Sequence, residues 1–146
     1  MAYYEYRHIV DFSETNLVGN VYYAHHVRWQ GTCREMFLRE KAPKMLREFQ
    51  QGLAFVTLST SCNYYHELAA FDEVCIRMRL VELSDHRLMM DFEYWRQSVD
   101  GKPSQSEELV ARGTQEITCM RRIGDSSEPA KWPAFFVDAL APYRET

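Results

Sequence analysis

The residues best suited to chemistry lie in a glycine-containing loop that leads directly into a long helical segment. Residues 16–24 read NLVGNVYYA, and a helix is expected from about Tyr23 to Lys41, ending before Pro43. The N-terminus of a helix presents unpaired backbone N–H groups and a partial positive charge, so it can hold an oxyanion. Gly19 allows the backbone to turn and a ligand or second chain to approach closely. This stretch therefore predicts an anion-binding site at the start of the helix.

The rest of the chain, which must hold this loop and helix in place, reads mostly as strands. Tyr4, Tyr6, His8, Val10 and Phe12 alternate with polar residues, which is the period of a half-buried strand. The other expected elements are a short helix at 44–50, strands at 54–67, 73–83, 87–97 and 107–123, turns at 84–86 and 100–103, a loop at 125–133 and a terminal helix at 134–140. One strand, a long helix and a run of antiparallel strands make an α+β layout.

The apolar positions of these segments indicate how they pack. In 73–83 the apolar residues point one way while Arg77 and Arg79 point the other, and in 87–97 the apolar residues share one face. The inward positions are Val74, Ile76, Met78 and Leu80 in the first segment, and Leu88, Met90, Phe92 and Tyr94 in the second. The long helix carries apolar groups on several faces, which is typical of a helix wrapped by a sheet. An unprotected sheet edge favours pairing with a second copy.

Length, charge and cysteine pattern narrow the class of protein. A chain of 146 residues fits a single domain spanning 1–146 and can bury one core. It has no apolar run of the ~18–20 residues that a membrane span needs, and MAYYEYRH lacks the basic and apolar regions of a signal peptide. Its four cysteines form no CxxC pair, so we expect a reduced, cytoplasmic protein. A net charge of −4 argues against nucleic acid as a partner.

Residues 11–38, DFSETNLVGNVYYAHHVRWQGTCREMFL, resemble the first strand, loop and central helix of hot-dog thioesterases of the 4-hydroxybenzoyl-CoA thioesterase type. More narrowly, ETNLVGNVYY together with RWQGTCREMFL is similar to the small thioesterases of enediyne polyketide biosynthesis. The resemblance implies one hot-dog domain, in which an antiparallel sheet wraps around a long central helix. It also implies that two sheets join edge to edge, giving a homodimer or homotetramer with the site at the dimer interface.

The same resemblance shows where the catalytic residues differ. The 4-hydroxybenzoyl-CoA type has an Asp three residues before the loop Gly, acting as nucleophile or base, and this chain has Asn16 there. An amide can do neither at ordinary pH. Several relatives carry a helix Glu at the position of Gly31, whereas the helix Arg is kept as Arg34. The enediyne subgroup has the same Asn and Arg, which implies hydrolysis without a catalytic carboxylate.

Our hypothesis for this chemistry is electrostatic stabilisation of a tetrahedral oxyanion, where one donor contributes roughly 2.7–4 kcal/mol. Backbone N–H groups at the helix start, led by that of Tyr23, would hold the thioester oxygen. Asn16 would orient the attacking water or donate to the oxyanion. Arg34, about three turns after Tyr23, would fix the Asn16 loop or supply positive charge. The residues expected to bind the oxyanion or substrate are Gly19, Tyr22, Tyr23, His26 and Gly31.

Several of these residues have a structural alternative. Asn16 could simply cap a turn, as Asn in loops commonly does. Arg34 could form a buried ion pair with Glu14 or Glu40. Gly31 could allow close packing of helix and sheet, or it could open a tunnel for a long acyl chain.

The remaining polar residues are open to more than one interpretation. His26 is the titratable group nearby whose ordinary pKa suits proton transfer. Because His25 and His26 are adjacent, they do not share a helix face, and no metal pair is expected. Asp11 and Glu14 precede the loop and could substitute for the missing Asp. The polar stretch at 59–61 has neither a GxSxG elbow nor a triad partner.

The sequence thus predicts a thioester hydrolase that releases a polyunsaturated or β-ketoacyl chain from the acyl carrier protein domain of an iterative polyketide synthase, without metal or organic cofactor. Alternatives are an acyl-CoA thioesterase of primary or aromatic metabolism and a non-catalytic acyl-binding protein. A hot-dog dehydratase would need an active-site His followed by a Pro-Gly step, which the sequence lacks. Basic residues within 41–47 and at 121–122 could receive either coenzyme A or an acidic carrier protein.

Overall fold

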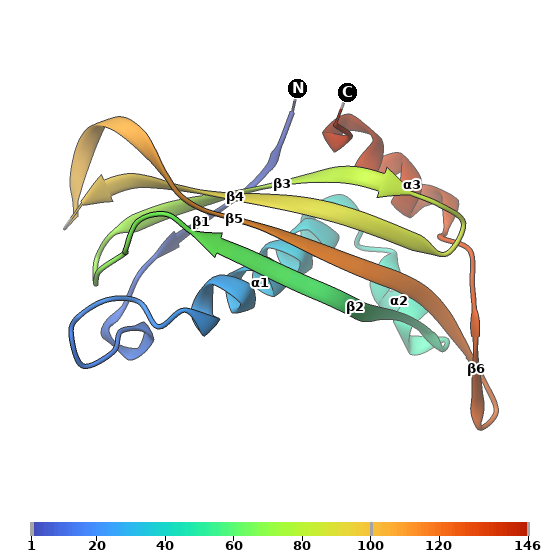
Figure 1. Cartoon of the computed structure of the whole chain (residues 1–146). Helices are drawn as coiled ribbons and strands as arrows, with labels where there is room; N and C mark the ends of the chain where they lie inside the picture. The colour runs from blue at the N-terminus through green and yellow to red at the C-terminus, as the bar shows by residue number, and fades with distance from the viewer. Residues whose placement is uncertain (1, 100, 146) are drawn as a thin grey trace.

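A computed structural model describes residues 2–99 and 101–145, leaving aside the side chains of 103–105 (Figure 1). In chain order the elements are β1 (Tyr4–Ile9), η1 (Phe12–Glu14), α1 (Ala24–Lys41), α2 (Met45–Gln50), β2 (Leu53–Tyr64), β3 (Glu73–Leu83), β4 (Arg87–Val99), β5 (Lys102–Ile123), β6 (Ser126–Pro129), α3 (Ala134–Leu140) and η2 (Ala141–Tyr143). Within the described residues, no helix is long and apolar enough to span a membrane.

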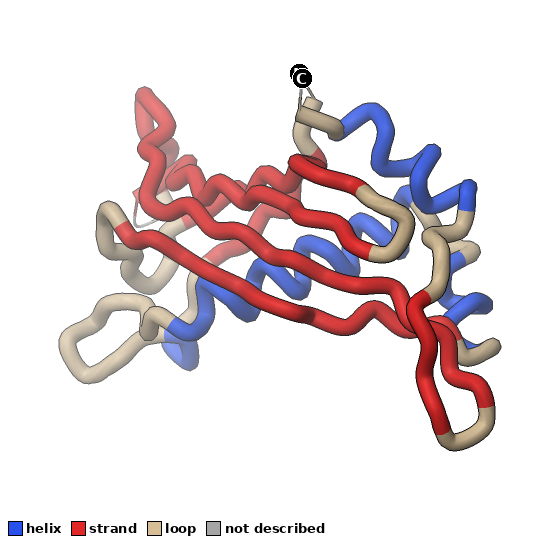
Figure 2. Tube along the Cα trace, turned by 45° about the vertical axis from the view of Figure 1, so that its right-hand side comes forward, coloured by secondary structure: helices blue, strands red, loops and turns tan. Residues whose placement is uncertain are grey.

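The strands form one antiparallel sheet in the order β1-β3-β4-β5-β2, and β6 pairs with β5 beside this path. The sheet curves over α1, which runs beneath its concave face (Figures 1 and 2). In this order β1 and β2 are the two edges, although they flank α1 in the sequence. The predicted α+β layout, with a sheet curved around one long helix, is confirmed.

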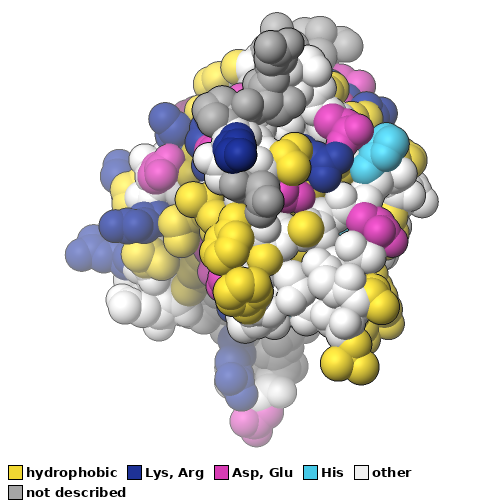
Figure 3. Space-filling view, turned by 90° about the vertical axis from the view of Figure 1, so that its left-hand side faces the viewer, with side chains coloured by type: hydrophobic (Ala, Val, Ile, Leu, Met, Phe, Trp, Pro, Cys, Tyr) yellow, Lys and Arg dark blue, Asp and Glu magenta, His cyan; other side chains and the backbone are white. Residues whose placement is uncertain are grey.

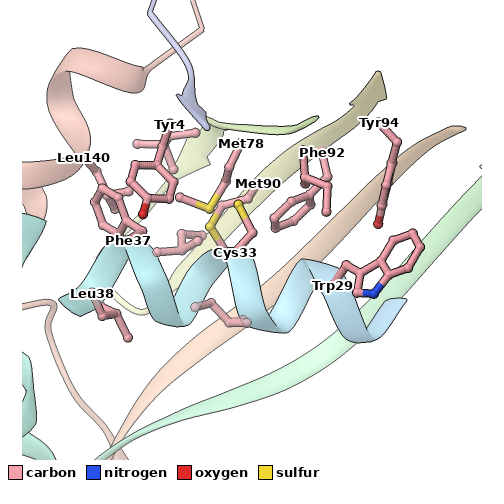
Figure 4. Packing of buried hydrophobic residues seen from close by; sticks show 14 of the residues in the cluster. Tyr4, Trp29, Cys33, Phe37, Leu38, Met78, Met90, Phe92, Tyr94 and Leu140 are labelled. Atoms are coloured by element: carbon pink, nitrogen blue, oxygen red, sulfur yellow. The ribbon is translucent and has the colours of Figure 1, made fainter. Parts of the chain in front are cut away.

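The core fills the space between the sheet and α1 (Figure 4). The inward positions predicted on β3 and β4 are at most 1% exposed: Val74, Ile76, Met78, Leu80, Leu88, Met90, Phe92 and Tyr94. They meet one face of the helix, whose buried residues are His26, Trp29, Gln30, Cys33, Phe37 and Leu38. The period-two pattern of the strands therefore decides which side of the sheet receives the helix.

Helix α1 starts one residue later than predicted. Tyr23 is its N-cap, with helical backbone angles but no capping side chain, and Ala24 is the first helical residue. The C-terminus at Lys41 agrees with the prediction, because Pro43 cannot continue the helix. The start of α1 is thus held by the preceding loop rather than by a Ser, Thr, Asp or Asn cap.

The prediction of a loop at 125–133 is wrong in part, because Ser126–Pro129 forms β6 and pairs with the end of β5. Gly124 adopts a positive φ of 59°, which allows the tight turn of this hairpin. The exposed residues of β6 carry no apolar alternation that could have revealed a strand. At the other end of β5, pairing begins at Lys102 within the predicted turn, and Asp100 of that turn lies outside the described residues.

Candidate active site

The loop before α1 is organised by the side chain of Asn16. Its Oδ1 accepts the backbone N–H groups of Val18 at 3.0 Å and Asn20 at 3.2 Å, and its own N–H donates to the Asn20 carbonyl at 2.8 Å. Gly19 completes the turn with a positive φ of 89°. The predicted turn-capping alternative is therefore present. The two side-chain bonds use only Oδ1, so the Nδ2 amide of Asn16 is left for a donor role.

Glu14 anchors this loop to the body of the protein. Its buried carboxylate oxygens lie 2.7 and 2.9 Å from Nε2 of His8, and accept Nε1–H of Trp29 at 2.8 Å and the N–H of Asp11 at 3.1 Å. Burial alone would raise the pKa of Glu14, but these hydrogen bonds outweigh it and lower the pKa. Its carbonyl accepts the N–H of Tyr22 at 2.9 Å. The geometry favours a structural role for Glu14 over that of a substitute base.

Several predicted site residues line one cleft of about 530 Å³ at the start of α1. Asn16, Tyr22, Tyr23 and His26 face it, together with residues 64–68 at the end of β2 and in the following loop. Residues 64–68 carry no sequence pattern that assigns them to the site, and their place beside the helix start depends on the tertiary fold. Seen from this end of the molecule, hydrophobic side chains gather on the surface in several groups (Figure 3).

The hydroxyl of Tyr64 ties β2 to the helix start. It donates to the Tyr23 carbonyl at 2.8 Å, and burial raises the pKa of Tyr64 to about 12. At the same turn, the N–H of His25 donates to the Tyr22 carbonyl at 3.0 Å. The N–H of Tyr23 has no partner among the described residues, as expected for a group that would receive an oxyanion.

His26 is buried at this site without a hydrogen-bond partner. It is 4% exposed, and neither ring nitrogen meets an acceptor or donor at hydrogen-bonding geometry, although the Tyr23 backbone lies close. Its ring packs against those of Tyr64 and Tyr94, with centroids 4.8 and 5.6 Å away. Burial lowers the pKa of His26 to about 4, and the Tyr23 backbone opposes that shift. The expectation of a pKa near neutrality is therefore wrong, and His26 is uncharged at pH 7.

Arg34 meets a neutral partner that the sequence analysis missed. Its Nη1 donates to Oε1 of Gln115 on β5 at 2.7 Å, and its Nε is buried without a partner. Burial lowers the pKa of Arg34, while the charge of Glu35 opposes this shift. The alternative of a buried ion pair is wrong, because Glu14 binds the groups described above and Glu40 accepts the hydroxyl of Tyr4 at 2.9 Å.

Within one chain the structure does not bring Asn16 and Arg34 together. Arg34 follows Tyr23 by eleven residues, or roughly 16 Å along the helix axis. It is not among the residues that line the cleft. Although Tyr23 and Arg34 point to a similar side of the helix, the distance along its axis keeps Arg34 away from the Asn16 loop of the same chain.

Gly31 borders open space, whereas a different glycine provides close packing. A Cβ added at Gly31 would meet no atom within 4 Å, so close packing of helix and sheet does not require it. At Gly113 on β5, a Cβ would lie 2.2 Å from Nε2 of Gln30 and 2.5 Å from the Ser61 carbonyl. Gln30 fills that place and binds β2, donating to the Ser61 carbonyl at 2.9 Å and accepting the Thr60 hydroxyl at 2.9 Å.

The basic residues considered for carrier or coenzyme A binding lie at the opposite end of α1 from the cleft, around α2 and the β5–β6 hairpin (Figure 1). Arg121 there lies 3.5 Å from the carboxylate of Glu48. Across the described residues, no three His, Cys, Asp or Glu side chains are placed together to hold a metal ion.

A curved antiparallel sheet over a long central helix is the hot-dog fold, and here it carries a cleft at the helix N-terminus. The chain belongs to the Thioesterase-like superfamily, which it matches over residues 10–140. It is therefore a thioester hydrolase.

Solved structures agree with this assignment. The dynemicin thioesterase, whose crystal structures reveal induced-fit and allosteric effects upon polyene binding, is 46% identical over 99% of both chains, with a TM-score of 0.90. A 1,4-dihydroxy-2-naphthoyl-CoA thioesterase from Synechocystis (17% identity, 96% of each chain, TM-score 0.80) shares the fold. So does a mutant 4-hydroxybenzoyl-CoA thioesterase with bound 4-hydroxybenzoyl-CoA (15% identity, 96% of this chain and 99% of that one, TM-score 0.81). No curated protein sequence matches the chain.

Proposed function

We propose that this thioesterase releases a polyene or β-ketoacyl chain from the acyl carrier protein domain of an iterative enediyne polyketide synthase. The observation that carries the proposal is the 46% identity, over 99% of both chains, to a dynemicin thioesterase studied for polyene binding. The site geometry supports it. Asn16, in the loop before α1, lines the cleft at the position where relatives carry an acidic catalyst. The nearby carboxylate of Glu14 is occupied by hydrogen bonds to His8 and Trp29.

The proposed reaction is hydrolysis without a protein carboxylate. Water attacks the thioester carbonyl, the oxygen of that carbonyl becomes an oxyanion, and the carbon–sulfur bond breaks to give a carboxylic acid and a thiol. The unpaired N–H of Tyr23 and the helix dipole stabilise the oxyanion. The Nδ2 amide of Asn16 donates to the oxyanion or orients the water. A β-ketoacyl thioester is more electrophilic than a simple one, which lowers the demand for a strong base.

Arg34 enters this scheme through a second copy of the chain. It lies roughly 16 Å along α1 from Tyr23, while β2 is an edge strand with exposed Val56 and Leu58. A copy joined along β2 by a two-fold axis sets the two α1 helices side by side in opposite directions. The later part of one helix then approaches the start of the other. We therefore place Arg34 in the site of the second subunit.

The decisive assay is incubation of the protein with a carrier protein loaded with a β-ketoacyl thioester, followed by mass spectrometry of the products. Rapid release of the acyl chain and free carrier thiol is expected, with slower turnover of the matching coenzyme A thioester. Faster turnover of the coenzyme A thioester would favour an acyl-CoA thioesterase. Binding without turnover would indicate a non-catalytic acyl-binding protein.

Asn16→Asp separates the turn-capping role of Asn16 from a donor role. A carboxylate retains the oxygen that accepts the Val18 and Asn20 N–H groups, so the loop is preserved, but the Nδ2 donor is lost. We expect turnover to fall about 10²-fold or more, as when an oxyanion donor is removed. Activity equal to or above that of the unmodified protein would show that a carboxylate at position 16 acts as a catalytic base, and would contradict the donor role.

The shared site is tested by mixing two inactive variants, Asn16→Ala and Arg34→Ala, under conditions that exchange subunits. If one site uses Asn16 from one chain and Arg34 from the other, random mixing of dimers restores about one quarter of the activity. If both residues act within one chain, the mixture stays inactive. A monomer by light scattering at micromolar concentration would also overturn the shared site.

A further inference from the structure

We propose that Gln115 is a positioning residue for Arg34: it fixes the guanidinium through one hydrogen bond and leaves its charge uncompensated. This inference rests on the proposed role of Arg34 in hydrolysis and goes beyond it by assigning a function to a residue on the opposite element. The two residues are 81 positions apart in the chain and 2.7 Å apart between Nη1 and Oε1.

The first support is the position of Gln115 in the sheet. It is 5% exposed and pairs in register with Met90 of β4 on one side and Thr60 of β2 on the other. Ile117 and Cys119 follow it at every second residue and are 0% exposed. A polar side chain at this inward position of a core strand calls for an explanation, because its burial costs free energy unless it is hydrogen-bonded.

The second support is the kind of partner that Gln115 provides. A carboxylate would bind the guanidinium through two parallel bonds and cancel its charge. An amide oxygen accepts from one N–H and carries no net charge. Among the described residues, no carboxylate forms an ion pair with Arg34, and its Nε remains buried without a partner. The positive charge is therefore held in place without being neutralised.

The third support is the surroundings of the guanidinium. Gly31, one turn earlier on α1, leaves space where a Cβ would meet no atom within 4 Å. Glu35, the acidic neighbour in sequence, is exposed and raises the pKa of Arg34 against the larger effect of burial. A charge in a partly buried setting interacts with a developing oxyanion more strongly than one in water. Gln115 thus keeps Arg34 both ordered and charged in a partly buried setting.

The test is the nearly isosteric substitution Gln115→Glu in the full-length protein, assayed with the β-ketoacyl carrier protein. The introduced carboxylate pairs with Arg34 and cancels its charge, so we expect kcat to fall about tenfold or more while KM changes less than about threefold. The thermal midpoint should stay the same or rise, because a paired carboxylate replaces a single neutral bond. The matched control is Gln51→Glu, which makes the same charge change at an exposed position.

The dependence of kcat on pH is a further test, because a purely structural role of Gln115 would not change it. Protonation of the new carboxyl restores a neutral partner, so the deficit of Gln115→Glu relative to the unmodified protein should shrink as the pH falls. Gln115→Met, of similar length, removes the acceptor and frees the guanidinium, so kcat should fall with no such recovery at low pH. If Gln115→Glu misfolds, the loss of kcat in folded Gln115→Met carries the test.

The results separate this inference from the proposed function. If the unmodified protein does not hydrolyse the thioester, the proposed function is overturned. If it does and Arg34→Ala retains full activity, the role of Arg34 and the positioning role of Gln115 are both overturned, while the proposed hydrolysis stands. If Arg34→Ala is impaired but Gln115→Glu and Gln115→Met keep a normal kcat, only the positioning role is overturned.

Discussion

The two sides of helix α1 hold their buried polar groups in different ways. On the side toward β1, the carboxylate of Glu14 has His8, Trp29 and the Asp11 backbone as partners. On the side toward β4 and β5, His26 has no partner at either nitrogen, and Arg34 has one neutral partner and an unpaired Nε. A fully bonded buried charge stabilises one conformation, whereas a polar group with open bonding capacity costs stability and is available to a ligand. We therefore assign Glu14 to anchoring the site, and His26 and Arg34 to the part of the site that is available for chemistry.

The sharpest test of this comparison is Arg34→Ala. We expect kcat for the carrier-bound thioester to fall about 10²–10³-fold, because a cation that stabilises the oxyanion is lost. The thermal midpoint should change little, since the guanidinium is poorly compensated. Steady-state kinetics and thermal unfolding measure the two effects, and Arg39→Ala, exposed on the same helix, is the control. A large loss of stability with normal kcat would show that Arg34 anchors the fold and does not take part in the chemistry.

The second prediction concerns pH and His26. Its pKa is lowered from the ordinary value of 6.5 to about 4 in the folded protein, so the unfolded state takes up the proton first as the pH falls. The free energy of unfolding should therefore decrease between pH 6.5 and 4, by about 3 kcal/mol in all. Denaturant titrations at several pH values measure this.

The matched variants for this pH dependence are His26→Gln and His66→Gln. The first removes the buried ring, so the decrease between pH 6.5 and 4 should largely disappear. The second changes a histidine with a half-exposed side chain and should leave the decrease intact. An unchanged decrease in His26→Gln would contradict the burial of an unprotonated ring.

Glu14→Gln should affect stability more than chemistry, which is the opposite of Arg34→Ala. The amide replaces charge-assisted bonds to His8 and Trp29 by weaker ones, and the expected loss is about 1.5–3 kcal/mol. Because the pKa of Glu14 is lowered, its stabilisation is present above the ordinary carboxyl pKa and is lost as the pH falls below it. Denaturant unfolding at pH 7 tests the loss, with the exposed Glu128→Gln as control. Intact stability with lost turnover would point to catalysis by Glu14.

The smallest expected effect is that of Trp29→Phe, about 1–2 kcal/mol, since one hydrogen bond to Glu14 and part of a buried ring are removed. Combined with Glu14→Gln, the losses should be less than additive, because one change weakens and the other removes the same hydrogen bond. A double-mutant cycle by denaturant unfolding measures the coupling. Strict additivity would show that the bond contributes nothing to the anchor.

The sequence predicted those features that depend on local pattern. The inward faces of β3 and β4 follow from period-two alternation, and the end of α1 follows from Pro43. Partners across the sheet could not be predicted, because they depend on strand register. Gln115 faces Arg34 only because β5 lies between β4 and β2.

The chemistry of single groups was harder to predict than their location. His26 was expected at the site and lines the cleft, yet its burial lowers the pKa below the range assumed from the residue type. Arg34 was expected to reach the Asn16 loop, yet distance along the helix keeps it away within one chain. The catalytic roles of both residues stay predictions.

The contact between Gly113 and Gln30 has an evolutionary consequence. Because a Cβ at position 113 would lie 2.2 Å from the Gln30 amide, β5 accepts no side chain there while Gln30 binds β2. A side chain at 113 would also lie 2.5 Å from the Ser61 carbonyl of β2, so a smaller residue at position 30 alone would not make room for it. Position 113 is therefore expected to stay glycine in homologues that keep this pairing of β2 with β5.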